Sequence, residues 1–483
     1  MQVAFDIPMV HESQVHDVLI AGLNSVLDHP SIEKRFDEHR WGNLFQGGMS
    51  KYFANLRDVN RYLSTLSFHV GVFRSNNSFE VNPVDLTAIE VIRLFEPEVY
   101  HELASNKAMM TSSLQFVGDS QQQRDQRKAA ATAIVNKAQA EKQEVMEEML
   151  KQLFPRFGTA LGGSHYLEDF DEGWYRELRV CAADAFDRYF TMAVPKGDIS
   201  QAALDRVLAV TGNRDALRDE LCQAARDRTL PQLLDRLEAY KKEIPIDHEP
   251  AFSTAIFDVG DELPADRPGM FGISTEMHAV RIVYWHLLLE KDIARRSQLL
   301  VSTVTATTGF RLPVEFVAIE VQRAAAKEDE RSTRSVDAPT LAQLKELCVA
   351  KLADAAANGR LVASPSLASL LYRWRDWAGI DAPRQFAAAA VVEPQGALRL
   401  AKAFLNRSVS QGMNDHVGRE NWFLTLGNLE TFVDFTAVEA GLRQLNAVEQ
   451  TPEDRRAIEK FTEAVARRRA GKPDLSGDTL RED

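Results

Sequence analysis

The sequence has only three cysteines in 483 residues, and they lie far apart at positions 181, 222 and 348. None belongs to a Cys-x-x-Cys pair, so the chain lacks both the disulfide framework of a small secreted protein and the paired ligands of a zinc site. Sparse, unpaired cysteines fit the reduced thiols of a cytosolic protein. We therefore expect a cytoplasmic location and cysteines that serve as core residues.

Long apolar runs are also missing. No stretch approaches the roughly 18 uninterrupted apolar residues that a membrane span requires. The best candidate, residues 280–289, is interrupted by Arg281 and His286. The N-terminus carries acids and prolines in place of a basic segment followed by an apolar run, which is not the pattern of a signal peptide. We expect no membrane as a partner.

The chain has fewer basic than acidic residues. The chain has 57 Lys and Arg against 70 Asp and Glu, which gives a formal net charge of −13 and a pI near 5.5. This balance argues against a general binder of nucleic acids or anionic membranes, although a local basic patch remains compatible with it. Nucleic acid is therefore not an expected partner.

The sequence motifs of common catalytic sites are absent as well. There is no Gly-x-x-x-x-Gly-Lys-Ser/Thr loop to cradle phosphates, because the only Gly-Lys pair, at 471–472, is followed by Pro473. The sequence also has no Gly-x-Ser-x-Gly elbow and no His-Glu-x-x-His pair. The acidic loop at 162–172 and the triplet 247–249 offer metal-ligand types, but we interpret both as loops. We expect no catalytic residue and no metal site in this chain.

What the sequence does contain is helical periodicity. Its 45% hydrophobic content is ample for buried cores, and its length suggests about three domain-sized units of roughly 150 residues each. Apolar residues repeat at alternating spacings of three and four from Leu56 to Val70, as on one face of a helix. Asn82 and Pro83 predict the start of a helix that ends near Phe95, and Pro97 starts another. The expected fold class is mainly α.

Two arginines one helical turn apart are the most informative local feature. Asn55 suits an N-cap, and Asp58 then falls at the third helical position. Arg57 lies in the first turn, where the helix dipole disfavours a cation, so an anion is expected nearby, and a phosphate suits it best. Arg61 would reinforce that contact or hold Asp58 in place. The alternative is that Asp58 pairs with both arginines on a solvated surface.

The residues around this pair resemble the KAP family of P-loop NTPases, which is related to the AAA+ and STAND ATPases. The resemblance covers roughly the first 110 residues and is weaker from 182 to 200. It is carried by residues 36–45, 52–66, 80–85 and 95–100.

The resemblance implies that this region is the helical lid after a nucleotide-binding core, with residues 2–8 similar to the core's last strand. It implies that Arg57 senses nucleotide phosphates and that Arg61 is the second basic residue of the motif, with Asn55 and Asp58 in support. The P-loop is missing, and so is the Walker B strand. We therefore expect ATP and magnesium only with a core that lies upstream or on a separate polypeptide, and no ATP hydrolysis by this chain alone.

Beyond the lid, the sequence predicts an irregular array of helices with a few short strands. Residues 119–153 are expected to form one long connecting helix, with a coiled-coil dimer as the alternative. Short strands are expected at 252–258 and 271–274, and a linker at 325–338. The expected domains are the core end and lid at 1–110, the connecting helix at 111–155, a middle domain at 156–325, a C-terminal domain at 339–471 and a disordered tail at 472–483.

Aromatic and basic residues alternate near position 374. Tyr372, Trp374 and Trp377 with Arg373 and Arg375 offer a stacking platform for nucleobases. The simpler interpretation is a core stripe flanked by surface arginines, which we favour.

These observations lead to one functional hypothesis and two alternatives. The chain is expected to be the lid and C-terminal region of a KAP-type NTPase that relays nucleotide state to a partner surface. The partners considered are the missing NTPase core, a protein effector and a homo-oligomer. Family context suggests bacterial defence against phage. The first alternative is a non-catalytic helical scaffold derived from a truncated NTPase. The second is a hydrolase or nuclease whose site is assembled from dispersed acids and histidines.

Overall fold

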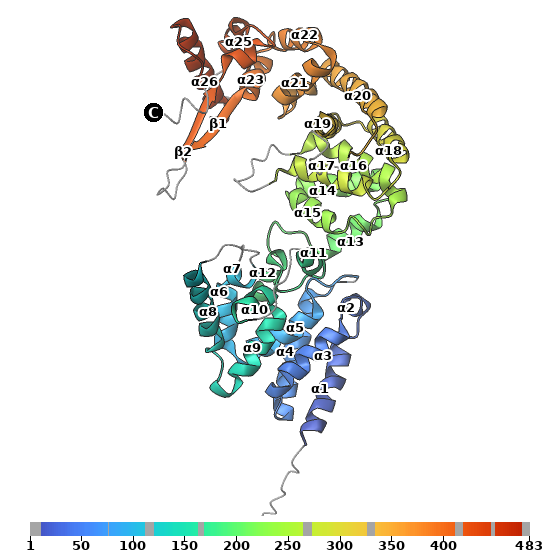
Figure 1. Cartoon of the computed structure of the whole chain (residues 1–483), viewed down its shortest axis with the longest axis vertical. Helices are drawn as coiled ribbons and strands as arrows, with labels where there is room; N and C mark the ends of the chain where they lie inside the picture. Colours follow the sequence, from blue (N-terminus) through green and yellow to red (C-terminus); the bar gives the residue numbers. More distant parts are fainter. Residues whose placement is uncertain are drawn as a thin grey trace, which may run out of the picture. The chain divides into compact units, whose positions relative to one another are not determined.

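The computed structural model describes residues 11–75, 77–111, 120–162, 169–263, 273–325, 334–410, 419–445 and 450–475. The expected mainly α fold is confirmed, because almost every regular element in these residues is helical (Figure 1). Contacts divide the chain into two compact units. The first comprises Met1–Ala209 and Arg226–Glu243, and the second Val210–Ala225 and Ile244–Asp483. The finer division into domains stays a prediction.

The first unit is a helical bundle built around α5. Its neighbours α4 and α6 pack on α5, and α1 packs on α4. The helices of this unit are α1 (Glu12–Leu27), α2 (Pro30–Glu33), α3 (Glu38–Gly47), η1 (Met49–Tyr52), α4 (Leu56–Phe73), α5 (Pro83–Phe95), α6 (Pro97–Ser105), α7 (Lys107–Thr111), α8 (Gln121–Val135), η2 (Ala140–Lys142), α9 (Gln143–Leu153), α10 (Pro155–Ala160), α11 (Asp169–Arg176), α12 (Ala183–Thr191), α13 (Gln201–Ala209) and α15 (Leu230–Ala239).

Helix α5 begins where its sequence predicts. The Asn82 side chain accepts hydrogen bonds from the backbone N–H groups of Val84 and Asp85, and Pro83 occupies the first turn. Every residue from Pro83 to Ile92 is buried, so the bundle covers this helix on all sides. Burial of both polar and apolar faces makes α5 the centre of the first unit.

The predicted single helix at 119–153 is wrong, because the described residues form two helices, α8 and α9, joined by a short turn. No glycine or proline interrupts the sequence there. The turn is instead held by tertiary contacts: the Gln139 N–H donates to Glu96 Oε2 at 3.1 Å, and its side chain donates to the Phe95 carbonyl at 3.3 Å. Packing against the end of α5 therefore decides the break, which local propensity cannot reveal.

The second unit contains the remaining helices and the one two-stranded sheet found in the described residues. Strands β1 (Leu405–Ser410) and β2 (Arg419–Leu424) are antiparallel, with Leu405 opposite Leu424 and Arg407 opposite Trp422. The helices are α14 (Arg214–Arg226), η3 (Ile246–His248), α16 (Glu249–Val259), η4 (Gly260–Glu262), α17 (Thr275–Leu287), α18 (Ile293–Ala306), α19 (Arg311–Ala325), α20 (Ala338–Ala357), η5 (Leu361–Ala363), α21 (Leu367–Ala378), α22 (Asp381–Ala390), α23 (Pro394–Ala403), α24 (Leu426–Glu430), α25 (Phe435–Leu442) and α26 (Pro452–Arg469).

The predicted strand at 252–258 is also wrong, because these residues form most of helix α16. All residues from Phe252 to Val259 are buried, including the polar Ser253, Thr254 and Asp258, so the segment has no solvent-exposed face that would mark a helical period. Of the second expected strand, 271–272 lie outside the described residues. Ile273 and Ser274 are not in a strand, and Ser274 caps α17 by accepting from Met277 N–H.

Two expected boundary segments lie within the second unit. Residues 326–333 of the expected linker lie outside the described residues, but Ser335 is fully buried and donates from its N–H to Glu320 Oε2 at 2.9 Å. Of the expected disordered tail, Asp474 accepts from the Gly427 N–H at 2.9 Å and from Arg468, so residues near 474 pack on α24. Residues 476–483 and the expected strand at 2–8 are not described.

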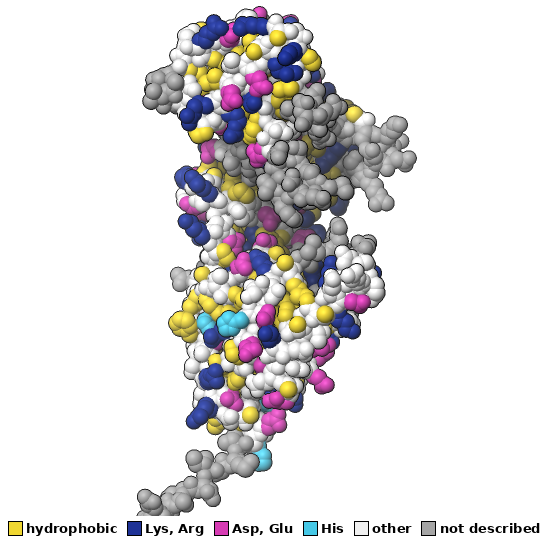
Figure 2. Space-filling model, turned by 90° about the vertical axis from the view of Figure 1, so that its left-hand side faces the viewer, with side chains coloured by type: hydrophobic (Ala, Val, Ile, Leu, Met, Phe, Trp, Pro, Cys, Tyr) yellow, Lys and Arg dark blue, Asp and Glu magenta, His cyan; other side chains and the backbone are white. Residues whose placement is uncertain are grey.

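Within the ranges described above, none of the helices combines the length and the apolarity needed to cross a membrane. On the face drawn in Figure 2, basic and acidic side chains are interspersed, with hydrophobic side chains between them.

Candidate functional site

The N-terminus of α4 forms as the sequence predicts. The Asn55 side chain accepts from the N–H groups of Arg57 at 2.9 Å and Asp58 at 3.1 Å, which confirms Asn55 as the N-cap. Arg57 and Asp58 therefore lie in the first helical turn, beside backbone N–H groups that have no partner within the helix. This arrangement brings together the positive helix terminus and one arginine, as expected.

The Arg57 side chain is exposed. In the part of the chain that the structure describes, no hydrogen bond or ion pair involves its guanidinium group, and Asp58 does not pair with it. The simple alternative, in which Asp58 satisfies both arginines, is therefore not seen in these residues. Arg57 remains a prediction as a phosphate sensor.

Arg61 was predicted to support Arg57 or to hold Asp58 in place, but its side chain contacts α5 instead. Its Nη2 donates to the carbonyl of Leu94 at 3.1 Å, and its guanidinium carbon lies 5.8 Å from the centre of the Phe95 ring. Carbonyls in the last turn of a helix carry partial negative charge, so a cation at the end of α5 is favourable. Arg61 therefore ties α4 to α5.

Buried contacts fix α4 against α5 beneath these arginines. Tyr62 donates its hydroxyl to the Thr87 carbonyl at 3.0 Å, and His69 Nδ1 lies 2.9 Å from Glu90 Oε2. Burial raises the pKa of Glu90, but hydrogen bonds from Arg93 and His69 outweigh burial and place the pKa below its usual value. The carboxylate stays charged and acts as a fixed acceptor between two helices.

A buried cluster at the start of α5 was missed from the sequence, which suggested only an acidic first turn. Asp85 is completely buried and forms ion pairs with Arg40 and, at 3.6 Å, with Arg179. It also accepts from the Val180 N–H at 2.8 Å. Burial, followed by repulsion from Arg179, lowers the pKa of Arg40 to about 10. This cluster joins three chain segments that are distant in sequence.

A second buried cluster surrounds Arg188, whose side chain is inaccessible to solvent. Its guanidinium donates to Glu80 Oε2 at 2.9 Å, to Asp198 Oδ2 at 2.5 Å and to the carbonyl of Ile199 at 2.7 Å. Glu80 also accepts from the Gln201 N–H at 2.8 Å, at the start of α13. The guanidinium of Arg188 is therefore occupied by contacts within the protein, and among the described residues the cluster links the segment before α5 to the segment before α13.

The triplet 247–249 departs from the predicted exposed turn. Asp247 is exposed, but His248 lies 2.9 Å from the Thr211 hydroxyl and Glu249 is fully buried at the start of α16. Burial raises the pKa of Glu249 to about 7, and its only hydrogen bond among the described residues comes from Ser253, at 2.7 Å.

No group of three metal-ligating side chains occurs in the described ranges. Of the candidate ligands in the loop at 162–172, His165 and Glu168 lie outside those ranges, and the side chains of Asp169 and Asp171 are not described either.

The aromatic set near position 374 is a core stripe, as favoured above. Trp374, Leu367, Leu370 and Leu371 are buried. Arg375 lies 4.8 Å from the centre of the Tyr372 ring and pairs with Asp376 at 2.6 Å. The described part of this stripe does not present a free stacking platform.

Comparison with known proteins gives no match to a family model, to a curated protein or to a solved structure. The resemblance carried by residues 36–100 therefore remains a hypothesis about this chain.

Proposed function

We propose that this chain is the lid and C-terminal region of a KAP-type P-loop NTPase and that Arg57 senses the phosphates of ATP. ATP and magnesium are bound by a core encoded upstream or on a separate polypeptide, and the helices beyond the lid relay nucleotide state to an effector. Bacterial anti-phage defence is the setting that the family resemblance suggests.

The observation that carries the proposal is the guanidinium of Arg57 at a capped helix N-terminus, which has no hydrogen-bond or ion-pair partner among the described residues. An exposed arginine in the first turn is disfavoured by the helix dipole by about 0.3–1 kcal/mol. The Asn55 side chain already accepts from the N–H groups of Arg57 and Asp58, so a phosphate near this terminus would be attracted by the arginine fork and by the positive end of the helix dipole. An arginine that contacts phosphate in only one lid position has different affinities for two conformations, which is the requirement for a nucleotide-driven switch.

The test is ATP turnover with the core restored, from the upstream reading frame or as the separate polypeptide. We expect Arg57→Ala to lower turnover by about 10³-fold, the usual cost of losing an arginine that stabilises a phosphoryl transition state. Arg74, which is exposed at the other end of α4, provides the matched control, and Arg74→Ala should leave turnover within about twofold. Equal turnover in wild type and Arg57→Ala would remove Arg57 from the mechanism.

A second candidate function is a non-catalytic helical scaffold, and the contacts of Arg61 favour it. This arginine of the motif serves the packing of α4 on α5, as a structural residue would. The scaffold hypothesis predicts that no upstream or separate P-loop polypeptide binds the chain. Co-purification of such a polypeptide in the presence of ATP and magnesium would contradict it.

A further inference from the structure

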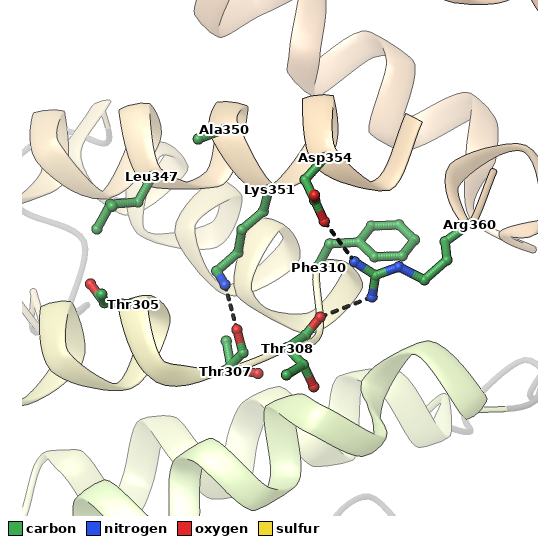
Figure 3. A pocket seen from close by; sticks show the side chains of 9 residues that line it. All are labelled: Thr305, Thr307, Thr308, Phe310, Leu347, Ala350, Lys351, Asp354 and Arg360. Carbon is green, nitrogen blue, oxygen red and sulfur yellow. Dashed lines mark hydrogen bonds and ion pairs between the residues drawn. The ribbon is translucent and has the colours of Figure 1, made fainter. Parts of the chain in front are cut away.

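A pocket of about 360 Å³ lies in the second unit, where the end of α18 meets α20 (Figure 3). The segment 305–310 forms one side of it, and Leu347, Lys351 and Asp354 from α20 form another. Arg360, which follows α20, closes the far end. None of these residues belongs to the region of Arg57.

The loop beneath the pocket is held in one position. Asp258 accepts from the Thr307 hydroxyl and the Thr308 N–H, both at 2.8 Å, and it pairs with Arg214 at 2.8 Å. At Gly309 a Cβ atom would lie 2.1 Å from the Phe257 carbonyl oxygen, so the loop approaches α16 as closely as a glycine permits. A ligand would therefore meet a preformed surface.

Two cations reach this loop from opposite sides. Lys351 donates to the carbonyl of Thr307 at 2.5 Å, and Arg360 donates to the carbonyl of Thr308 at 2.9 Å (Figure 3). Arg360 is also bonded to Asp354 at 3.0 Å, and its guanidinium lies 5.5 Å from the centre of the Phe310 ring. The carboxylate of the pocket is thus already paired with Arg360.

Lys351 has spare hydrogen-bonding capacity. An ammonium group has three N–H donors, and among the described residues Lys351 uses one. No carboxylate of these residues forms an ion pair with it. Its side chain is half-buried, and this burial lowers the pKa of the ammonium more than the nearby carboxylates of Asp258 and Asp261 raise it.

We propose that this pocket binds an anionic oxygen group, a carboxylate or a phosphate, with Lys351 as its anchor. The anion takes the two ammonium donors of Lys351 that have no acceptor among the described residues. Arg360, which already pairs with Asp354 and Asp261, bounds the far end of the pocket. Leu347 and Phe310 contact the apolar part of the ligand. The proposal is independent of the role proposed for Arg57, and each can fail without the other.

The test uses the full chain with inorganic phosphate and with acetate as probes, against chloride at equal ionic strength. Acylation of Lys351 by acetic anhydride, quantified by mass spectrometry, reports occupancy, because a bound anion shields the amine and holds it protonated. We expect saturable protection of Lys351 and a matching calorimetric isotherm. Protection by phosphate alone identifies a phosphate site, and protection by acetate as well identifies a carboxylate site.

Matched variants on α20 separate binding from general charge. We expect Lys351→Met to weaken calorimetric binding at least tenfold, whereas Lys345→Met, on the same helix but outside the pocket, leaves it unchanged. Lys351→Arg should keep measurable binding. If circular dichroism shows that Lys351→Met does not fold, the protection of Lys351 in the wild type and the binding of Lys351→Arg test the proposal instead. Absence of saturable protection by either anion, or equal losses in the two Met variants, would overturn the proposal.

Discussion

Arg57 and Arg61 are neighbours on one helix but have different contacts. Both are exposed on α4, one helical turn apart. Arg61 donates to the carbonyl of Leu94 in the last turn of α5, whereas no hydrogen bond or ion pair among the described residues involves the guanidinium of Arg57. The difference arises from the neighbouring helix and not from the motif. Of the two arginines, only Arg57 has no partner among the residues that the structure describes.

Glu249 is a single residue whose pKa is changed by burial. Its carboxyl group is fully buried, and its Oε2 atom has no hydrogen-bond partner among the described residues. Burial disfavours the charged form, so the folded state holds a proton at pH values where the unfolded chain has released it. The free energy of unfolding therefore depends on pH through this group.

We predict that the stability contributed by Glu249 is greatest below its unfolded pKa near 4.5 and is lost as pH rises to about 7. The shift corresponds to a loss of about 3 kcal/mol. Glu249→Gln, which resembles the protonated carboxyl, should remove this part of the pH dependence and raise the free energy of unfolding at pH 8. Urea unfolding at pH 5 to 8 measures the free energy of unfolding of each variant, and Glu346→Gln, at an exposed position, is the control.

If the free energy of unfolding of Glu249→Gln depends on pH in the same way as that of the wild type and of Glu346→Gln, then burial does not raise the pKa of Glu249, and the prediction is contradicted.

Helix α4 begins correctly because its cap is local. Asn55 is close in sequence to the N–H groups that it accepts from, so its role depends on no distant segment. The breaks and boundaries of α8, α9 and α16 are different, because contacts with α5 and with the core of the second unit decide them.

For α4 we predict that Asn55→Ala lowers the free energy of unfolding by about 1 kcal/mol, because two backbone N–H groups lose their acceptor. Asn55→Ser should retain most of the stability. Asn60→Ala on the exposed face of the same helix is the control and should change stability by less than about 0.5 kcal/mol. Urea unfolding followed by circular dichroism measures all three, and equal effects of Asn55→Ala and Asn60→Ala would disprove the cap.

In the first unit, buried ion clusters join segments far apart in the sequence. The Arg188 cluster links Glu80, which follows α4, to Asp198 and to the start of α13. The Asp85 cluster links α3, α5 and the segment at 179–180. Removing one partner from such a cluster leaves a buried charge without compensation.

We predict that Arg188→Met destabilises the chain by about 3–5 kcal/mol, since the carboxylates of Glu80 and Asp198 lose their buried partner. Arg57→Met is the control: it removes an exposed arginine and should cost less than about 0.5 kcal/mol. Denaturant unfolding measures both. A large cost for Arg57→Met would show that this arginine is structural and would count against its proposed role.

Much of the fold followed from local signals. Helical periodicity predicted α4, and the Asn82-Pro83 and Pro97 starts predicted α5 and α6. The core position of Trp374 followed from its apolar neighbours at helical spacing. The sequence could not distinguish a strand from a buried helix at 252–258, because a segment buried on all sides has no solvent-exposed face.

The candidate site was predicted only in part. Asn55, Arg57 and Asp58 lie as expected, since all three belong to one helical turn. The pocket at Lys351 was missed, because its walls come from three segments that no sequence spacing connects. The sequence signal that was present is three threonines, Thr305, Thr307 and Thr308, at the end of a helix and followed by Gly309.

The sequence by itself determined the helical class, the positions of capped helix starts and the absence of a phosphate-binding loop from this chain, because each depends on residues close together in the sequence. The tertiary structure decided where α8 ends, which charges are buried, which arginine of the motif has no partner among the described residues and where two cations meet on one loop. Those outcomes depend on solvent exclusion and on partners tens of residues away, and no local pattern specifies either.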